Sequence, residues 1–201
     1  MNLFIDLDGT LIDSKLRLYQ LFQYLVIDSE LSFEEYWELK RNKIDHKEIL
    51  SSKFNYTNDQ YITFLNKWMS EIELEKWLDL DIPFNGVTSF LENMSKQNSL
   101  HVVTARQSSK NTLAQLKKFN WDNYLDSVFI TEQKHSKLDL VKNNINVTSD
   151  DWFIGDTGKD IEVGKKLGIK TAAVLSGFLN EKCLIGYNPD IIIENITNFE
   201  L

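Results

Sequence analysis

Cysteine, proline and histidine are scarce in this sequence, which has one, two and three of them among 201 residues. The single cysteine, Cys183, cannot form an internal disulfide, so a disulfide-stabilised secreted scaffold is excluded. Cys183 lies in a helix-like stretch with no histidine near it. We therefore interpret it as a small apolar side chain rather than as a catalytic nucleophile.

Long apolar segments and an excess of positive charge are missing as well. No run approaches the ~18 apolar residues of a membrane span, and the N-terminus lacks the basic segment of a signal peptide. The chain has 30 acidic residues against 22 Lys and Arg, and a formal net charge of −8. Nucleic acid and membrane surfaces are therefore not expected partners, because both require a basic face. We expect a cytoplasmic protein.

The composition is that of one globular domain that carries a modest insertion. Hydrophobic residues make up 42% and charged residues 26% of the chain, which is long enough to bury a core. The expected strands are residues 2–7, 100–103, 128–130, 152–154, 171–175 and 191–193, and the expected helices are 87–96, 109–119, 136–143 and 160–167. Alternating strands and helices predict an α/β fold, in which helices cover both faces of a mostly parallel sheet.

Residues 15–80 differ from the rest because they show helical patterns and no strand pattern. Apolar residues recur at helical spacing from Leu18 to Leu25, and capping-box sequences start at Ser32 and Thr57. Asp45 is placed to cap a short helix between them. We expect 15–80 to form a helical insertion and residues 1–14 and 81–201 to form the α/β core.

Four carboxylates and a hydroxyl follow the expected strands. Asp6 and Asp8 lie at the end of the first strand, Thr104 follows the second and Asp156 the fourth, with Asp160 four residues further on. Ligands of open parallel sheets bind outside the carboxyl ends of the strands, so these groups are expected to meet. Crowded carboxylates repel one another unless a cation lies among them, and oxygen ligands suit Mg²⁺. The pattern predicts a magnesium site beside a carboxylate nucleophile, a combination suited to phosphoryl transfer.

A lysine is expected to complete such a site by contacting phosphate. Lys137 lies at the start of a helix before the Asp156 strand, and Lys134 is the rival. The plain alternative for the Asp-x-Asp-Gly-Thr segment is an ordinary turn, since Asp and Gly dominate turns. Two such acidic segments in order, each after an apolar strand, favour the functional interpretation.

These segments resemble the sequence motifs of the haloacid dehalogenase superfamily of hydrolases. Residues 6–14 (DLDGTLIDS) resemble its first motif and 102–106 (VVTAR) its second. Residues 137–140 (KLDL) are similar to the third motif, which is the least specific, and 155–161 (GDTGKDI) to the fourth. Residues 83–87 (PFNGV) resemble the segment that returns the chain to the core. The resemblance implies a Rossmann-like core with a type-one helical cap, as in phosphoglycolate phosphatase and its relatives.

The resemblance also implies roles for single residues. Asp6 would be the nucleophile that forms an aspartyl-phosphate, and Asp8 the general acid that later activates water. Asp6, the backbone carbonyl of Asp8 and Asp156 would hold Mg²⁺, and Asp160 would orient metal-bound water. The groups implied to bind phosphate are Thr104, Ala105, Lys137 and Gly9. No Lys-Pro precedes the fourth motif, as it does in many close relatives, so the choice between Lys137 and Lys134 stays open.

Asp8 favours phosphate esters within the superfamily. Dehalogenases and phosphonate hydrolases resemble this pattern but lack an acid there, and an alkoxide leaving group needs a proton whereas a halide does not. We therefore expect a phosphatase of a small phosphorylated metabolite, acting as a monomer or homodimer. A sugar-phosphate mutase of the same build and a non-catalytic phosphate-binding regulator are the alternatives.

One basic stretch in the insertion, residues 40–47, is a candidate for recognising the leaving group. It falls between two expected helices, near the position that the resemblance gives to the specificity-determining turn of the cap. Arg41, Lys43 or His46 would contact an anionic or hydroxyl-rich leaving group. The alternative is a solvated loop whose Lys40 and Arg41 are favoured by the helix C-terminus.

Overall fold

The computed structural model describes residues 1–201, and the chain divides into two compact units. The core unit consists of Met1–Asp13 and Ile82–Leu201, and the helical unit of Ser14–Asp81. The sequence suggested residues 15–80 for the insertion, so each boundary between the units differs from that range by one residue.

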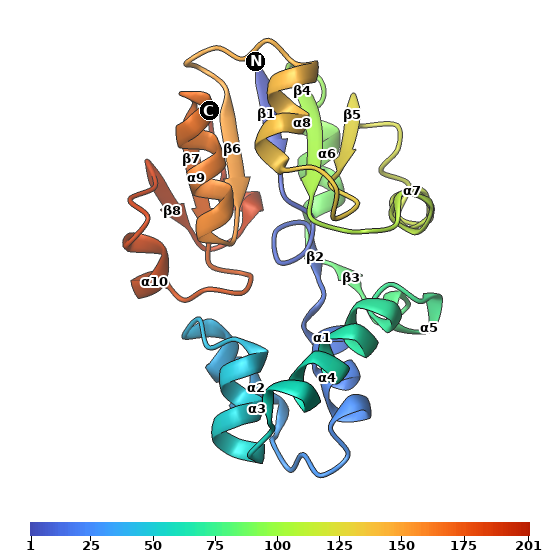
Figure 1. Ribbon diagram of the computed structural model, residues 1–201. Helices are drawn as coiled ribbons and strands as arrows, with labels where there is room; N and C mark the ends of the chain where they lie inside the picture. Colours follow the sequence, from blue (N-terminus) through green and yellow to red (C-terminus); the bar gives the residue numbers. More distant parts are fainter. The chain divides into compact units, whose positions relative to one another are not determined.

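The core unit is built on a six-stranded sheet whose neighbouring strands are all parallel. Their order is β5-β4-β1-β6-β7-β8 (Figure 1). The strands are β1 (Asn2–Ile5), β4 (Ser99–Thr104), β5 (Ser127–Ile130), β6 (Trp152–Gly155), β7 (Lys170–Val174) and β8 (Ile191–Ile193). β1 therefore lies between β4 and β6, and the carboxyl ends of these three strands share one edge of the sheet.

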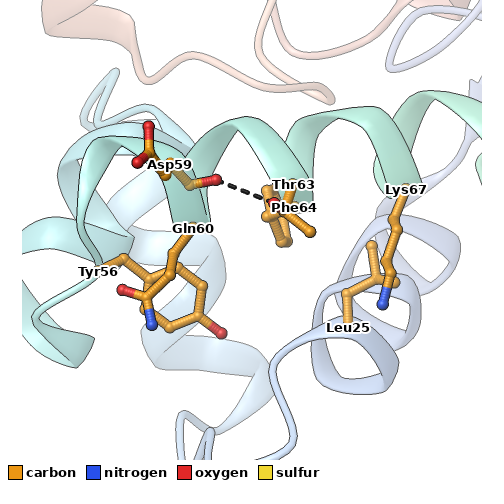
Figure 2. Close-up of a pocket in the computed structure, with 7 residues that line it drawn as sticks. All are labelled: Leu25, Tyr56, Asp59, Gln60, Thr63, Phe64 and Lys67. Carbon is orange, nitrogen blue, oxygen red and sulfur yellow. Dashed lines mark hydrogen bonds between the residues drawn. The ribbon is translucent and has the colours of Figure 1, made fainter.

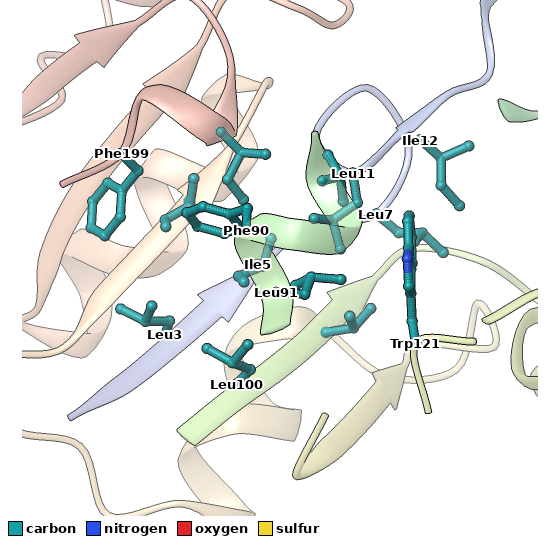
Figure 3. Packing of buried hydrophobic residues seen from close by; sticks show 14 of the residues in the cluster. Leu3, Ile5, Leu7, Leu11, Ile12, Phe90, Leu91, Leu100, Trp121 and Phe199 are labelled. Carbon is teal, nitrogen blue, oxygen red and sulfur yellow. The ribbon is translucent and has the colours of Figure 1, made fainter. Parts of the chain in front are cut away.

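Side chains that alternate along the strands pack into separate cores on the two faces of the sheet. Leu3 and Ile5 of β1 belong to the largest cluster, together with Trp121 and Phe199 (Figure 3). Phe4, between them in the chain, belongs to a second cluster. A buried strand must have apolar residues on both faces, which explains why β1 appears in the sequence as a continuous apolar run.

Helices cover both faces of this sheet, so the predicted α/β fold is confirmed (Figure 1). The helices of the core unit are α6 (Val87–Met94), α7 (Ser109–Lys118), α8 (Lys137–Asn144), α9 (Gly158–Leu167), α10 (Glu181–Ile185) and the 3₁₀ helix η1 (Ile196–Asn198). Phe90 and Leu91 of α6 pack in the cluster of Leu3, whereas Val141 of α8 packs in the cluster of Phe4.

A short antiparallel pair of strands was not expected from the sequence. β2 (Ile12–Asp13) pairs with β3 (Ile82–Pro83) where the chain leaves the core unit and returns to it. A strand of two residues has no alternation of apolar and polar side chains, so no periodic signal marks it.

The helical unit contains α1 (Lys15–Leu25), α2 (Phe33–Arg41), α3 (His46–Phe54), α4 (Asn58–Glu71) and α5 (Glu75–Leu78). The expected N-caps are confirmed: the Ser32, Asp45 and Thr57 side chains accept hydrogen bonds from backbone N–H groups three residues on. Even the longest helix, α4, has only 14 residues, and no helix combines the length and apolar character needed to span a bilayer.

α4 also borders a depression on the surface of the helical unit (Figure 2). Its lining residues are Leu25, Tyr56, Asp59, Gln60, Thr63, Phe64 and Lys67. The Thr63 hydroxyl donates to the Asp59 carbonyl oxygen at 3.0 Å. No residue that the sequence suggested for catalysis or recognition lines this depression, so it is not a candidate active site.

His46 lies in an aromatic cluster inside the helical unit. Its ring centroid is 4.3 Å from that of Trp68 and 5.3 Å from that of Phe64, and it stacks on Phe22 at 5.6 Å. The Tyr36 hydroxyl oxygen is 2.8 Å from Nε2 of His46. Burial lowers the pKa of His46 well below its ordinary value, and the positive charge of Lys40 lowers it further. This placement favours a packing role for His46.

The lowered pKa of His46 predicts that acid destabilises the helical unit. Unfolded His46 takes up a proton below about pH 6.5, whereas folded His46 stays neutral, so the folded state loses relative stability as pH falls. We expect a loss of up to about 1.4 kcal/mol in the free energy of unfolding per pH unit below that point. Urea unfolding in EDTA from about pH 8 to pH 5 measures this loss, because the slope of the unfolding free energy against pH reports the protons bound on unfolding.

His46→Phe is the matched control, because it keeps an aromatic ring and removes the proton site. The difference in unfolding free energy between the two proteins isolates His46 from the core carboxylates, which titrate equally in both. Curves that stay parallel across the pH range would contradict the prediction.

Candidate active site

The first candidate side chains of the site lie where β1 ends. The N–H of Asp6 donates to the Ile154 carbonyl oxygen of β6 at 2.9 Å, and the residue is only 7% exposed. Gly9 turns the chain with φ of +82°, and a Cβ at this position would overlap Oδ2 of Asp156. The turn after β1 therefore needs glycine for its backbone angle and for its close approach to the carboxylate that follows β6.

Lys137 joins two of the carboxylates. It is the first residue of α8, whose N-cap Ser136 accepts a hydrogen bond from the Asp139 N–H at 3.0 Å. Its Nζ lies 2.6 Å from Oδ1 of Asp6 and 2.6 Å from Oδ1 of Asp160. The start of α8 thus places the ammonium group of Lys137 between Asp6, which follows β1, and Asp160, in the first turn of α9.

Lys134 is placed differently. Its side chain is 70% exposed, and Nζ is 3.2 Å from Oε2 of Glu132. An exposed pair of this kind has little energetic weight. Of the two lysines that the sequence left open, Lys137 is the one beside the carboxylates.

Asp6, Asp156 and Asp160, which are three of the four carboxylates that the sequence places at the strand ends, form an acidic cluster. All three are buried, and one oxygen atom of each lies within 4.8 Å of the others. Oδ2 of Asp156 accepts a hydrogen bond from the Phe178 N–H at 2.6 Å, but Oδ1 is buried without a hydrogen-bond partner. An unpaired buried carboxylate oxygen is costly, and a hard cation would satisfy it. The residues present therefore fit Mg²⁺.

Asp160 has less capacity for direct metal binding than Asp156. Its Oδ1 accepts from Lys137, and its Oδ2 accepts from the Thr157 N–H at 3.1 Å and from the Thr157 hydroxyl at 2.6 Å. A Cβ on Gly155 would overlap the Asp160 side chain, so the glycine before Asp156 lets the two acids approach. This arrangement suits a carboxylate that orients neighbouring groups.

Burial sets the protonation behaviour of the cluster. It raises the pKa of Asp6 to about 7, against the lowering effect of Lys137 and with a further rise from Asp160. It also raises the pKa of Asp156 well above its ordinary value, and the charges of Asp6 and Asp160 add to the rise. For Lys137, burial alone would lower the pKa, but Asp160 and Asp6 raise it above its ordinary value. Positive charge beyond that of Lys137 would favour the ionised forms of Asp6 and Asp156.

Thr104 and Ala105 lie at the carboxyl end of β4, next to β1 in the sheet. Thr104 is 1% exposed, and its Oγ1 accepts a hydrogen bond from the Arg106 N–H at 3.4 Å. The carbonyl oxygen of Ala105 accepts from Nε2 of Gln133 at 2.8 Å. The loop after β5 therefore holds the backbone of residues 104–106 in place beside the site.

Two further contributions to the site were not assigned from the sequence. The segment after β7 closes over Asp156 through the Phe178 N–H, and the Ser176 hydroxyl donates to the Gly9 carbonyl oxygen at 2.8 Å. Arg106 forms a two-point ion pair with Asp8, from Nε to Oδ2 and from Nη2 to Oδ1, both at 2.8 Å. The one sequence signal for the segment after β7 was the position of Ser176, which follows an expected parallel strand.

The three cap candidates lie in and after α2. Arg41 is the last residue of α2, and Lys43 is exposed with φ of +65° in the connection to α3. His46, the first residue of α3, packs in the aromatic cluster. The basic stretch therefore spans the end of α2, the connection and the start of α3, where Arg41 and Lys43 stay candidates for contact with a ligand and the ring of His46 packs against aromatic side chains.

Comparison with known proteins finds similar sequences and similar structures. The chain is 23% identical to a protein of Halalkalibacterium halodurans named pyrophosphatase PpaX, over 95% of this chain and 91% of that protein. A solved Clostridium difficile structure described as a candidate phosphatase has a TM-score of 0.81, with 20% identity, 98% of this chain and 94% of that chain covered.

A Haemophilus somnus structure described as a predicted phosphoglycolate phosphatase has a TM-score of 0.71, with 18% identity, 96% of this chain and 93% of that chain covered. Structural likeness at such identities establishes the shared fold. The family model of haloacid dehalogenase-like hydrolases matches residues 3–174, a span that includes every acidic residue of the site. The chain therefore belongs to the haloacid dehalogenase-like hydrolases.

Proposed function

We propose that this hydrolase is a magnesium-dependent phosphatase of small phosphorylated metabolites and that it transfers the phosphoryl group to Asp6. The observation that supports this most directly is the placement of Asp6. Its carboxylate lies 2.6 Å from Nζ of Lys137, in a buried cluster whose Asp156 has one oxygen without a partner. A carboxylate nucleophile, a cation suited to binding phosphate and a buried carboxylate oxygen suited to binding a metal therefore occur together.

The reaction has two steps. In the first, a carboxylate oxygen of Asp6 attacks phosphorus, the bond from phosphorus to the leaving oxygen breaks, and Asp8 gives that oxygen a proton. In the second, Asp8 takes a proton from water, the water oxygen attacks phosphorus, and the bond to Asp6 breaks. Inorganic phosphate leaves, and both acids return to their starting states.

The remaining groups prepare Asp6 for attack and hold the phosphate. Asp6 must be ionised to attack, and Lys137 counters the rise in pKa that burial causes. Lys137, Thr104 and the backbone of Gly9 and Ala105 would bind phosphate oxygens. Asp6, Asp156 and the Asp8 carbonyl would hold Mg²⁺, which supplies charge that neutralises the phosphate. Asp160 holds Lys137 and stands beside this metal site.

Phosphate monoesters and pyrophosphate are both candidate substrates. Asp8 favours an ester, because an acid in this position assists an alkoxide leaving group. The named relatives favour pyrophosphate as a second candidate, because the proteins from Halalkalibacterium halodurans and Listeria monocytogenes are called pyrophosphatases. Either substrate would be attacked by Asp6 in the same way.

A screen of sugar phosphates, nucleotides, small acid phosphates and pyrophosphate with Mg²⁺ tests the proposal. We expect phosphate release that depends on Asp6 and on the metal. Analysis of the organic product separates hydrolysis from a mutase reaction, which would return the phosphoryl group to another hydroxyl of the sugar. No phosphate release and no isomerised product from any compound would contradict the proposal and favour a binding protein.

Lys137 and Lys134 provide a matched pair of variants. Lys137→Ala should lower kcat/KM for 4-nitrophenyl phosphate by at least ~10²-fold, because it removes the cation beside Asp6. Lys134→Ala should change it by less than ~3-fold, because that side chain is exposed. Steady-state kinetics at saturating Mg²⁺ measures both. The opposite ranking would move the phosphate contact to Lys134.

The basic residues after α2 predict a difference between substrates. Arg41→Glu and Lys43→Glu should lower kcat/KM for the best metabolite of the screen by ~1–3 kcal/mol in transition-state binding. Hydrolysis of 4-nitrophenyl phosphate should barely change, because its leaving group has no anionic or hydroxyl groups to recognise. If both substrates keep their wild-type rates, this stretch is a solvated connection and the leaving group is recognised elsewhere.

A further inference from the structure

Arg106 has the geometry of a residue that fixes the general acid. Its side chain is 3% exposed and forms the two-point ion pair with Asp8, whose side chain is 20% exposed. A planar guanidinium that meets both carboxylate oxygens sets the rotation of the carboxylate as well as its position. Asp8 is therefore held by the core unit in one orientation.

Arg106 is itself fixed from several directions. Its Nη1 donates to Oε1 of Gln115 on α7 at 2.7 Å, and Gln115 is 6% exposed. Its carbonyl oxygen accepts from the Glu132 N–H at 3.0 Å. Glu132 and Gln133 both have positive φ, 49° and 57°, which is uncommon for residues other than glycine. The loop after β5 is thus bent toward the backbone of Arg106, while α7 orients its guanidinium.

The ion pair leaves Asp8 able to exchange a proton. An ionised carboxylate has about four acceptor positions, and the two hydrogen bonds from Arg106 occupy two of them. A protonated carboxyl group keeps a lone pair on each oxygen, so both hydrogen bonds from Arg106 can persist while the O–H proton of Asp8 goes to the leaving oxygen. Asp8 is also close enough for its charge to act on Asp6. Arg106 can therefore hold Asp8 beside the nucleophile without blocking its chemistry.

We propose that Arg106 is the positioning residue of the general acid Asp8 and that Gln115 maintains its orientation. This inference rests on the proposed phosphatase function. In the first step Asp8 gives its proton to the leaving oxygen as the bond to phosphorus breaks and Asp6 forms the new one. A carboxylic acid that is free to rotate spends less time aligned with that oxygen. Loss of Arg106 should therefore slow the step most for leaving groups that depend most on receiving a proton.

Leaving-group dependence distinguishes this role from a purely structural one. 4-Nitrophenolate leaves far more readily without a proton than phenolate does, and kcat/KM reports the steps up to its departure. For Arg106→Ala we expect kcat/KM to fall ~10–10²-fold with phenyl phosphate and less than ~3-fold with 4-nitrophenyl phosphate. Asp8→Ala gives the reference pattern, with a larger difference in the same direction.

Conservative variants keep the test decisive if Arg106→Ala does not fold. Arg106→Lys keeps the charge but loses the two-point geometry, so it should recover part of the phenyl phosphate rate. Gln115→Met keeps the length of the side chain and removes the acceptor for Arg106, so it should show a weaker form of the same difference. Circular dichroism and thermal unfolding of each variant show whether the fold is retained.

The outcomes separate this inference from the proposed function. Wild-type rates in Asp6→Asn would contradict the phosphatase mechanism itself. Equal losses on both substrates in Asp8→Ala would remove the acid role of Asp8, and the inference would fall with it. Asp8→Ala could lose more kcat/KM with phenyl phosphate than with 4-nitrophenyl phosphate while folded Arg106 and Gln115 variants lose the same with both. That result would overturn the inference about Arg106 alone.

Discussion

Asp6→Asn should lower kcat of the phosphatase reaction by at least ~10³-fold, because the amide keeps the shape of the side chain but is a poor nucleophile. The substitution also removes one negative charge from the acidic cluster, and it leaves Lys137 a neutral amide oxygen in place of the charged carboxylate oxygen that lies 2.6 Å from its Nζ. Steady-state hydrolysis of 4-nitrophenyl phosphate at saturating Mg²⁺ measures the loss. This is the largest effect that we expect from a single substitution.

Asp122→Asn is a matched control, because it makes the same chemical change at an exposed position of the core unit. It should keep the wild-type rate. Mass spectrometry of acid-quenched wild-type enzyme should also find a phosphoryl group on the peptide that contains Asp6, and none in Asp6→Asn. Near-normal turnover in pure Asp6→Asn would end the covalent mechanism.

Removal of the metal should abolish activity, and Mg²⁺ should restore it. EDTA would remove the cation expected among the carboxylates of Asp6, Asp156 and Asp160, whose negative charges would then repel an incoming phosphate. Zn²⁺ should restore activity poorly, because the cluster offers no histidine or thiolate ligand. Full activity in chelator, with no metal in the purified protein, would contradict the prediction.

Metal binding itself should depend on pH. Burial raises the pKa of Asp6 to about 7 and that of Asp156 well above its ordinary range, so protons compete with Mg²⁺ for these carboxylates. We expect the affinity for Mg²⁺ to fall at least ~10-fold from about pH 8 to pH 6, measured by calorimetry on metal-free protein. Asp156→Asn should bind Mg²⁺ much more weakly at every pH, and Asp122→Asn should behave as wild type. An affinity that does not change with pH would contradict the prediction.

Much of the core could be predicted because its signals are local. Buried parallel strands require continuous apolar runs, and residues such as Phe4 are apolar because both faces of the sheet are covered. Helix starts were found from Ser32, Asp45 and Thr57 because a cap is a contact over three residues. The positions of Asp6 and Asp156 could be expected to meet because parallel strands end at a common edge.

The features that sequence reasoning missed depend on contacts between distant residues. Arg106 and Asp8 are 98 residues apart, and nothing in the local pattern around either one indicates a partner. The sequence offered His46 as one of three candidates in a basic stretch, and its aromatic neighbours could not be expected from that stretch. The rings of Phe22, Phe64 and Trp68 surround it only when three helices pack together.

The sequence by itself determined the parallel α/β class, the helical character of residues 15–80 and the strand ends that carry the acids, since each follows from periodicity, capping or the direction of parallel strands. Tertiary structure decided which polar groups act together. It placed Lys137 rather than Lys134 beside Asp6, left Oδ1 of Asp156 without a partner and joined Arg106 to Asp8. The physical reason is that hydrogen bonds and ion pairs act over a few ångströms, whereas the residues that form this site come from strand ends and loops far apart in the chain.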